Sequence, residues 1–267
     1  MSDRFGTWQL DALVAVGGLG EIWRASRDAQ ETRQTCALKR IHTHLVRNDD
    51  AREQFAREQQ LATTLPPHPN VVRGLEAGAL DERSYLAMEL VLGEDLRRIV
   101  APSPSPTAPK PARAPLDRNR ALDIVLAACD AASHLHANGW VHGDINPSNL
   151  VIGDRVVLID LGIARELGRP GTPRGTHAYM APEQIRGEAW TAATDVFALG
   201  VVLWELLAGA RLFHRGPSYL SMQAVMEFEP PALADRSLDA LVHAALAKNP
   251  ARRLATPADL ADQLRGS

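Results

Sequence analysis

The stretch "VHGDINPSNLVIGDRVVLIDLG", residues 141–162, decides the fold, because it sets three polar side chains around two short apolar runs. Asp144 and Asn149 lie five positions apart in a loop before the first run, and Asp160 follows the second run. An antiparallel hairpin of the two runs would return Asp160 to the side of the loop that carries Asn149. Two oxygen ligands would then face one divalent cation, and Asp144 could accept a proton from an attacking hydroxyl.

A glycine turn and a lysine upstream add the parts that a phosphate would need. Residues 16–20, "VGGLG", separate two β-like runs, and their N–H groups could approach phosphate oxygens, although an ordinary hairpin turn explains them equally well. Lys39 in "ALKR" lies on the next apolar strand and needs a partner there. Glu58, on an amphipathic helix predicted over residues 49–65, is the candidate partner of Lys39. Glu53 of the same helix is expected to be a solvated glutamate.

The spacing of apolar residues predicts two lobes. Residues 1–91 combine three strands within residues 8–41, the helix, and two further strands at "NVVRGLEAG" and "SYLAMELV". Residues 92–267 are mainly helical, and the connection "ELVLGED" joins the two lobes. Helices are predicted from residue 117 to 139 and near 195–209, 235–247 and 256–265.

A proline-rich segment, "APSPSPTAPKPARAPLD" at residues 101–117, interrupts the second lobe near its start. Its prolines exclude a helix or a central strand, so we expect an extended surface insertion. Three interpretations stay open for it. It is a docking site for a proline-recognising partner, an autophosphorylated loop, or an insertion without a role.

Composition narrows the partners and the compartment. The net charge of -3 gives no long-range attraction to nucleic acid or to an anionic membrane. Cys36 and Cys129 lie far apart in apolar contexts, which argues against a disulfide framework and favours a cytoplasmic location. The start "MSDRFGTWQL" lacks signal-peptide features, and "DVFALGVVLWELLAGA" is too short for a membrane span. We expect any sensor domain or membrane anchor to lie outside this sequence.

Further motifs complete a pattern that runs almost from end to end: "HPNVV", "YLAMELV", "GTHAYMAPEQ", "TDVFALGVVLWELLAG" and "KNPARR". With these, the chain resembles the bacterial-type (Hanks-type) serine/threonine protein kinases. The resemblance implies an α+β, two-lobed protein kinase-like fold with a small β-rich N-lobe and a larger, mainly helical C-lobe. It also implies transfer of the γ-phosphate of ATP to protein hydroxyls, with Mg²⁺ or Mn²⁺, and ATP between the lobes near residues 89–92.

The resemblance assigns roles to individual residues. Lys39 would hold the α- and β-phosphates and pair with Glu58, and Asp144 of the HGD loop (residues 141–149) would be the catalytic base. Asn149 and Asp160 would be the metal ligands. The residues implied to line the ATP site are Val14, Val16, Gly17, Gly18, Gly20, Ile22, Ala37, Lys39, the gatekeeper Met88, and Glu89 and Val91, whose backbone groups would face adenine.

Three structural roles follow from the same resemblance. Glu183 of "APE" would pair with Arg253 of "NPARR", which ties the APE segment (residues 160–183) to the last helices. Asp195, at the start of the apolar helix, would hold the backbone of the HGD loop. Thr176 matches the threonine that marks serine/threonine acceptors.

Two departures from the family pattern concern glycine positions. Ala15 replaces the first glycine of the loop, at a cost of roughly 1 kcal/mol if that position needs a positive φ. Gly143 replaces the arginine that normally reads an activation-loop phosphate. Apart from Tyr179, the APE segment has only Thr172 and Thr176 as hydroxyl side chains. We therefore expect an enzyme that is not switched by a phosphothreonine.

Asn146 replaces a lysine that touches the transferred phosphate in the family. A neutral hydrogen bond in place of a charged one costs about 1.5 to 3 kcal/mol, which corresponds to roughly a tenfold to hundredfold slower rate. Because Lys39 and all three polar residues of the opening stretch remain, a slowed kinase is the expected result. Two alternatives stay open: a pseudokinase scaffold, and a small-molecule phosphotransferase of the aminoglycoside or choline kinase kind, which shares "HGD" but lacks an "APE" segment.

Overall fold

The computed structural model describes residues 3–29, 32–100 and 115–267 of the chain. Most of the proline-rich segment, residues 101–114, lies outside the described residues, and so do the insertion and the docking role expected there. The chain divides into two compact units, which we call the N-lobe (Met1–Leu92 with Asp160–Gly162) and the C-lobe (Gly93–Ile159 with Ile163–Ser267). The expected α+β composition, one β-rich and one mainly helical unit, is confirmed.

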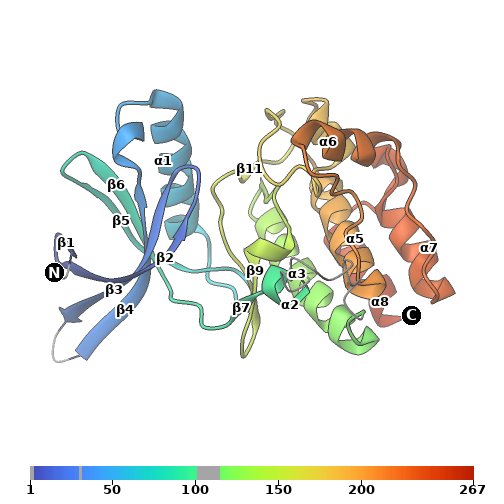
Figure 1. Ribbon diagram of the computed structural model, residues 1–267, viewed down its shortest axis with the longest axis horizontal. Coiled ribbons are helices and arrows are strands. Elements are labelled where there is room, and N and C mark those ends of the chain that lie inside the picture. The colour runs from blue at the N-terminus through green and yellow to red at the C-terminus, as the bar shows by residue number, and fades with distance from the viewer. Residues whose placement is uncertain (1–2, 30–31, 101–114) are drawn as a thin grey trace, which may run out of the picture. The chain divides into compact units, whose positions relative to one another are not determined.

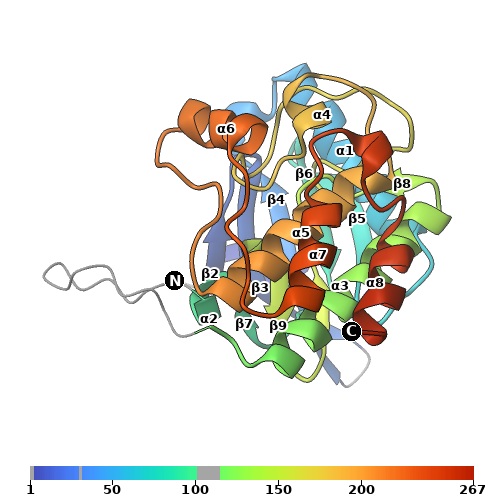
Figure 2. The same cartoon turned by 90° about the vertical axis from the view of Figure 1, so that its right-hand side faces the viewer.

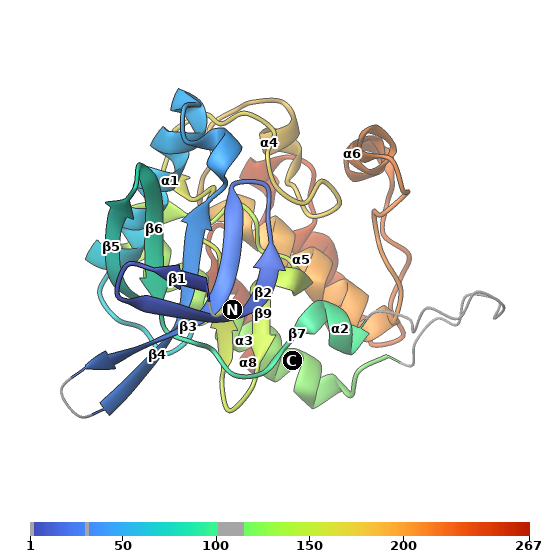
Figure 3. The same ribbon diagram turned by 60° about the vertical axis from the view of Figure 1, so that its left-hand side comes forward.

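Among the described residues, the N-lobe is built on an antiparallel sheet in the order β1-β2-β3-β4-β6-β5, which can be followed in Figures 1 and 3. Its strands are β1 (Asp3–Phe5), β2 (Trp8–Val16), β3 (Gly20–Ala29), β4 (Thr32–Ile41), β5 (Gly74–Leu80) and β6 (Arg83–Met88). Strand β1 was not predicted, and β5 begins four residues later than expected. Val71 and Val72 are buried in the preceding loop, so their apolar pattern resembled that of a strand.

The core of the sheet and helix α1 (Asp49–Thr64) give the N-lobe its stability. The buried side chains of the sheet core are Phe5, Trp8, Leu10, Ala25, Cys36, Leu38 and Ala87. The side chain of Asn48 caps α1 by accepting a hydrogen bond from the N–H of Ala51, 2.9 Å away. Phe55 and Leu61 are buried at helical spacing, and Glu58 lies on the same buried face. The helix therefore carries one carboxylate into the interior of the N-lobe.

The glycine turn joins β2 to β3, and the N–H of Gly17 donates to the carbonyl of Gly20 over 2.8 Å. The expected cost at Ala15 does not arise. Ala15 lies in the β2–β3 ladder opposite Ile22, and it is not among the non-glycine residues with positive φ. Gly20 is needed for a different reason: a Cβ there would lie 2.2 Å from the carbonyl oxygen of Arg40 on β4.

Helices are the main regular elements of the described C-lobe, as Figure 2 shows, and α3, α5, α7 and α8 pack together. The helices are α2 (Leu96–Val100), α3 (Arg118–Ala137), α4 (Pro182–Ile185), α5 (Ala192–Ala208), α6 (Ser218–Glu227), α7 (Arg236–Ala245) and α8 (Pro257–Arg265), with short 3₁₀ turns η1 (Thr43–Leu45, in the N-lobe), η2 (Pro147–Asn149) and η3 (Pro250–Arg252). The sequence predicted α3, α5, α7 and α8. It did not predict α2, α4 or α6, which are short or bury small side chains such as Ser221 and Ala224.

Helix α5 is buried along nearly its whole length, which accounts for its apolar sequence. Its one buried glutamate, Glu205, accepts hydrogen bonds from the hydroxyl of Tyr179 at 2.6 Å and from the N–H of Leu212 at 2.9 Å. In the part of the chain that the structure describes, none of the helices has the length and apolar run that a membrane crossing requires.

Short strands position the HGD loop. Strands β9 (Leu150–Ile152) and β10 (Val156–Leu158) form the antiparallel hairpin that the sequence predicted, and β7 (Glu94–Asp95) pairs with β9. Strand β8 (Trp140–Val141), just before the loop, pairs with β11 (Arg165–Glu166) of the APE segment. The loop is therefore held by a strand on each side.

The close approach at Gly20 generates a stability prediction. We expect Gly20→Ala to lower the free energy of unfolding by about 1 to 3 kcal/mol, because its Cβ would collide with the β4 backbone. Gly18→Ala is the matched control: its added Cβ meets nothing within 4 Å, so its effect should stay within about 0.5 kcal/mol. Urea denaturation followed by circular dichroism measures both. Equal unfolding free energies for the two variants would contradict this account of the turn.

Candidate active site

A buried charge cluster lies in the N-lobe. The ammonium Nζ of Lys39 lies 2.6 and 2.8 Å from the two carboxylate oxygens of Glu58, and 3.1 Å from Oδ1 of Asp160. Lys39 and Glu58 are 6% and 2% exposed, whereas Glu53 of the same helix is exposed. The expected ion pair is present, and the sequence distinguished the buried glutamate from the solvated one.

The pKa shifts of this cluster show one cation shared by two anions. Burial alone would lower the pKa of Lys39, but the carboxylates of Asp160 and Glu58 outweigh it and hold its pKa well above the usual value. Burial raises the pKa of Glu58; the charge of Lys39 opposes this rise, and the charge of Asp160 adds to it. Lys39 therefore stays protonated at neutral pH, next to more negative charge than it can balance.

Asp160 is held in an unusual backbone conformation. Its φ is 64°, and the other two described non-glycine residues with positive φ, Asp81 and Glu82, belong to the tight turn between β5 and β6. Oδ1 of Asp160 also accepts the N–H of Gly162 at 3.2 Å. A Cβ on Gly162 would lie 2.9 Å from Asp160 Oδ1 and 3.1 Å from Glu58 Oε2. Such strain away from a turn is typical of functional positions.

The other residues expected in the ATP site lie on the sheet of the N-lobe. Val14 and Val16 are 55% and 63% exposed at the end of β2. In the ladders, Ile22 lies opposite Lys39, and Ala37 lies opposite Met88. Exposed apolar side chains such as those of Val14 and Val16 can form part of a ligand-binding surface.

The chain that leaves β6 presents backbone groups. The N–H of Glu89 donates to the carbonyl of Arg73 over 2.9 Å, and Glu89 Oε1 accepts the N–H of Arg73 at 3.0 Å. Glu89 and Val91 are both partly buried. The N–H of Glu89 is therefore used inside the N-lobe.

In the C-lobe, Asp144 is surrounded by N–H donors. Its Oδ1 accepts from the backbone N–H of Thr176 at 2.9 Å and from the side-chain amide of Asn146 at 3.0 Å. The amide nitrogen of Asn149 donates to Oδ2 of Asp144 at 3.1 Å and to its carbonyl at 2.9 Å. The Oδ1 of Asn146 in turn accepts the N–H of Ser148 at 2.9 Å. The loop thus fixes the orientation of its own carboxylate.

Asn149 also has an atom suited to a metal ion. The amide nitrogen makes both hydrogen bonds described for the Asn149 side chain. The amide oxygen is therefore the side-chain atom that could bind a cation. Amide and carboxylate oxygens, as in Asn149 and Asp160, are the donors that Mg²⁺ prefers. Within the described ranges no group of three or more His, Cys, Asp or Glu side chains could hold a metal ion. A site completed by phosphate oxygens needs no such group. The metal role of Asn149 and Asp160 stays a prediction.

Asp195 holds the backbone of the HGD loop. Its Oδ2 accepts the N–H of His142 at 2.9 Å and its Oδ1 accepts the N–H of Gly143 at 2.8 Å. His136 on α3 contacts the same carboxylate, with Nε2 2.7 Å from Oδ2. Burial opposes the charged form of Asp195, but its contact with His136, the nearby histidine charges and the N–H of Gly143 outweigh burial and hold its pKa below the usual value.

The sequence did not identify Gln184 or Trp190 as part of the site. The amide of Gln184 donates to the carbonyl of Gly143 over 2.9 Å, so both peptide groups of this glycine are engaged. Gly143 has φ 74°, and a Cβ there would lie 2.3 Å from Cζ3 of Trp190. The motif "APEQ" contains Gln184 and could have indicated its role, but no sequence pattern links Trp190 to Gly143.

The expected ion pair at the end of the APE segment is present. Glu183 and Arg253 form a bidentate pair with N–O distances of 2.8 and 3.0 Å, and both side chains are almost fully buried. Arg253 also donates to the carbonyls of Ala193 at 2.6 Å and Ala247 at 3.0 Å. The hydroxyl of Thr194 donates to Glu183 over 3.0 Å. These bonds satisfy a charge pair that would otherwise be costly to bury.

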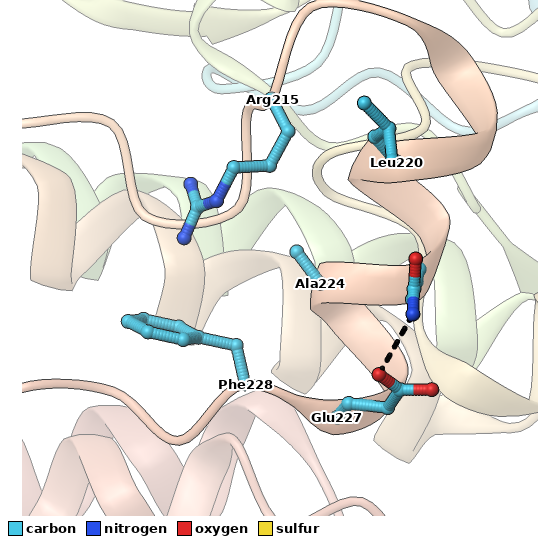
Figure 4. Close-up of a pocket in the computed structure, with 6 residues that line it drawn as sticks. Arg215, Leu220, Ala224, Glu227 and Phe228 are labelled. Carbon is cyan, nitrogen blue, oxygen red and sulfur yellow. Dashed lines mark hydrogen bonds between the residues drawn. The ribbon is translucent and has the colours of Figure 1, made fainter.

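A surface hollow of about 490 Å³ on the C-lobe lies beside α6 (Figure 4). Arg215 lies 4.9 Å above the ring of Phe228 at its edge, and the amide of Gln223 donates to Glu227 over 3.0 Å. None of the residues that line the hollow was expected in the site. None of them belongs to the HGD loop or to the APE segment.

Comparisons with known proteins point in one direction. The sequence profile of the protein kinase domain matches residues 8–264. The chain is 33% identical to a probable serine/threonine-protein kinase of Corynebacterium efficiens. The match covers 99% of the present chain and 41% of that protein. It is 35% identical to the serine/threonine-protein kinase PknB of Mycolicibacterium smegmatis, and this match covers 99% of the present chain and 43% of PknB. The chain spans about two fifths of the length of these relatives.

Proposed function

Because this chain belongs to the protein kinase domain family, we propose that it is a serine/threonine protein kinase that transfers the γ-phosphate of ATP to protein hydroxyls. The observation that carries the proposal is the buried Lys39 between Glu58 and Asp160. Burying an ammonium and its partner carboxylates is costly, and apolar residues would stabilise the lobe as well or better. A cluster of this kind is therefore retained for binding or catalysis. The bacterial relatives, which are serine/threonine-protein kinases by name, support the same activity.

In this proposal the N-lobe binds the nucleotide. Lys39 donates to the α- and β-phosphates, and its bond with Glu58 fixes the position of its Nζ. The turn with Gly17, Gly18 and Gly20 presents backbone N–H groups to the phosphates. The apolar side chains Val14, Val16, Ile22, Ala37 and Met88 contact the adenine and ribose, and the backbone of Glu89 and Val91 hydrogen-bonds the base.

The HGD loop acts on the acceptor hydroxyl. Asp144 accepts the hydroxyl proton while the acceptor oxygen bonds to the γ-phosphorus and the bond between that phosphorus and the β,γ-bridging oxygen breaks, which releases ADP. The donors of Asn146, Asn149 and Thr176 hold the carboxylate in one orientation, so little reorganisation is needed when the hydroxyl arrives.

A divalent cation completes the site in this proposal. Asn149 through its amide oxygen and Asp160 through its carboxylate would hold it, with phosphate oxygens as further ligands. When bound, the cation neutralises phosphate charge during transfer. We propose Mg²⁺ as the cation, with Mn²⁺ as the substitute.

The proposed rate is low because Asn146 replaces a charged contact. Its side-chain amide donates to Asp144, so it orients the base and supplies no positive charge to the transferred phosphate. The missing ammonium is the reason to expect a slowed enzyme. We also propose that activity does not depend on phosphorylation of the APE segment, since Gly143 offers no guanidinium to a phosphate.

The central test is a Mg·ATP phosphotransfer assay with a generic protein acceptor, in which we expect Asp144→Asn to abolish incorporation of phosphate. Asn keeps the size of the side chain but cannot take a proton, and the loss of a general base costs about a hundredfold to ten-thousandfold in rate. Equal incorporation by wild type and variant would exclude the enzyme and favour a pseudokinase. Mass spectrometry of the products identifies the acceptor, and label on a small metabolite alone would exclude protein phosphorylation.

The second prediction concerns Asn146. We expect Asn146→Lys to raise kcat by roughly tenfold to a hundredfold, because a lysine restores a charge-assisted contact worth about 1.5 to 3 kcal/mol. Asn146→Met is the control, because methionine is similar in length to lysine but carries no charge. It should lower kcat because Asp144 loses a donor. Steady-state kinetics on one protein acceptor gives both values. An Asn146→Lys variant that is no faster than wild type would argue against the proposed attenuation.

The third prediction concerns phosphorylation of the APE segment. We expect Thr172→Ala with Thr176→Ser to keep the wild-type rate within about threefold, since no arginine at position 143 reads a phosphate. Phosphatase-treated wild type serves as the control for residual phosphorylation. Loss of activity in the double variant, with recovery through Thr172→Glu, would show that the enzyme does need a phosphate here.

A further inference from the structure

Trp190, in the loop between α4 and α5, is 1% exposed and is one of the largest buried side chains of the C-lobe. Two glycines allow the ring to lie where it does. A Cβ on Gly143 of the HGD loop would lie 2.3 Å from Cζ3 and 2.8 Å from Cε3. A Cβ on Gly171 of the APE segment would lie 2.5 Å from Cζ2 and 2.6 Å from Cε2. The backbones of Gly143 and Gly171 therefore lie close to opposite sides of the six-membered ring.

Arg165 and Gly171, at the two ends of residues 165–171 of the APE segment, lie against the same indole. The guanidinium of Arg165 lies 5.4 Å above the ring, and its Nη1 donates to the carbonyl of Pro170 over 2.9 Å. Arg165 thereby bridges the two ends of this short stretch. The aromatic ring supplies the surface on which the stretch closes.

Backbone hydrogen bonds fasten this stretch to the chain on either side of the ring. The N–H of Gly168 donates to the carbonyl of Trp190 over 2.8 Å, and the N–H of Trp190 donates to the carbonyl of Arg169 over 3.1 Å. Pro170 and Ala189 form an isolated antiparallel bridge. On the other side, β11 pairs with β8 immediately before the HGD loop.

We propose that Trp190 is a positioning residue that keeps residues 165–171 and the HGD loop in register, in the place of a phosphate bound to an arginine. The inference deepens the proposed kinase function, and its structural part can be tested without catalysis. Packing of one apolar ring does not depend on a modification, so the stretch is ordered in the unmodified chain. Thr172, directly after Gly171, is exposed.

The ring, not its polar atom, carries the effect. Nε1 of Trp190 is buried and has no hydrogen-bond partner among the described residues. An unpaired N–H destabilises a buried site. A phenylalanine, which lacks this group, should therefore keep the arrangement, whereas an alanine should release it.

Hydrogen exchange on phosphatase-treated protein tests the proposal. We expect Trp190→Ala to speed amide exchange at residues 165–171 by about tenfold or more relative to wild type, because the stretch loses the surface on which it closes. Trp190→Phe should exchange within about threefold of wild type. In the phosphotransfer assay, Trp190→Ala should lower kcat with little change in KM for ATP, and Trp190→Phe should restore it.

Trp204→Ala is the matched control, because Trp204 is a second buried tryptophan whose Nε1 donates to the carbonyl of Pro231, away from the HGD loop. It should reduce global stability without a selective rise in exchange at residues 165–171.

If Trp190→Ala does not fold, Gly171→Ala provides the same test, since its Cβ would push the ring aside. Wild-type exchange at residues 165–171 in a folded Trp190→Ala or Gly171→Ala variant would overturn the proposal. If wild type lacks kinase activity, only the kinase function fails.

Discussion

The buried carboxylate of Asp195 is the constraint on which the HGD loop depends. It receives two successive peptide N–H groups, from His142 and Gly143, and the imidazole of His136. Removing a carboxylate from water is costly, and these donors compensate for that cost. Gly143, which gives one of these two N–H groups, has a φ of 74°. The side chain of Asp144, one residue later, is oriented by the donors of Asn146, Asn149 and Thr176.

The two lobes use different physics to hold their functional groups. In the N-lobe, Lys39, Glu58 and Asp160 are held by charge, with one ammonium between two carboxylates. In the C-lobe, Asp144 is held by neutral amides, and the APE segment is held by an aromatic ring and a bidentate ion pair. In the proposed function, the divalent cation would supply the positive charge that this cluster lacks. In the proposed function, these neutral donors would orient Asp144 as the base.

Much of this arrangement could be predicted from the sequence. The β9–β10 hairpin and the burial of Glu58 follow from periodicity, which depends on neighbours along the chain. The pairing of Glu183 with Arg253 came from the family resemblance. The cost at Ala15 was expected only if that position has a positive φ, and this condition is not met because Ala15 lies in the β2–β3 ladder, which the residue type does not reveal. The contacts of Trp190 and Gln184 with Gly143 could not be predicted, because they join residues about 40 or more positions apart without any pattern.

The contact between Gly143 and Trp190 also constrains how such a sequence can change over time. Any side chain at position 143 would overlap the indole and would have to adopt a left-handed backbone. A lineage that acquired a large residue at 143 first would therefore pass through a disrupted loop. If position 190 became small first, the cavity could accept a new side chain. Substitutions at positions 143 and 190 are therefore expected to be non-additive.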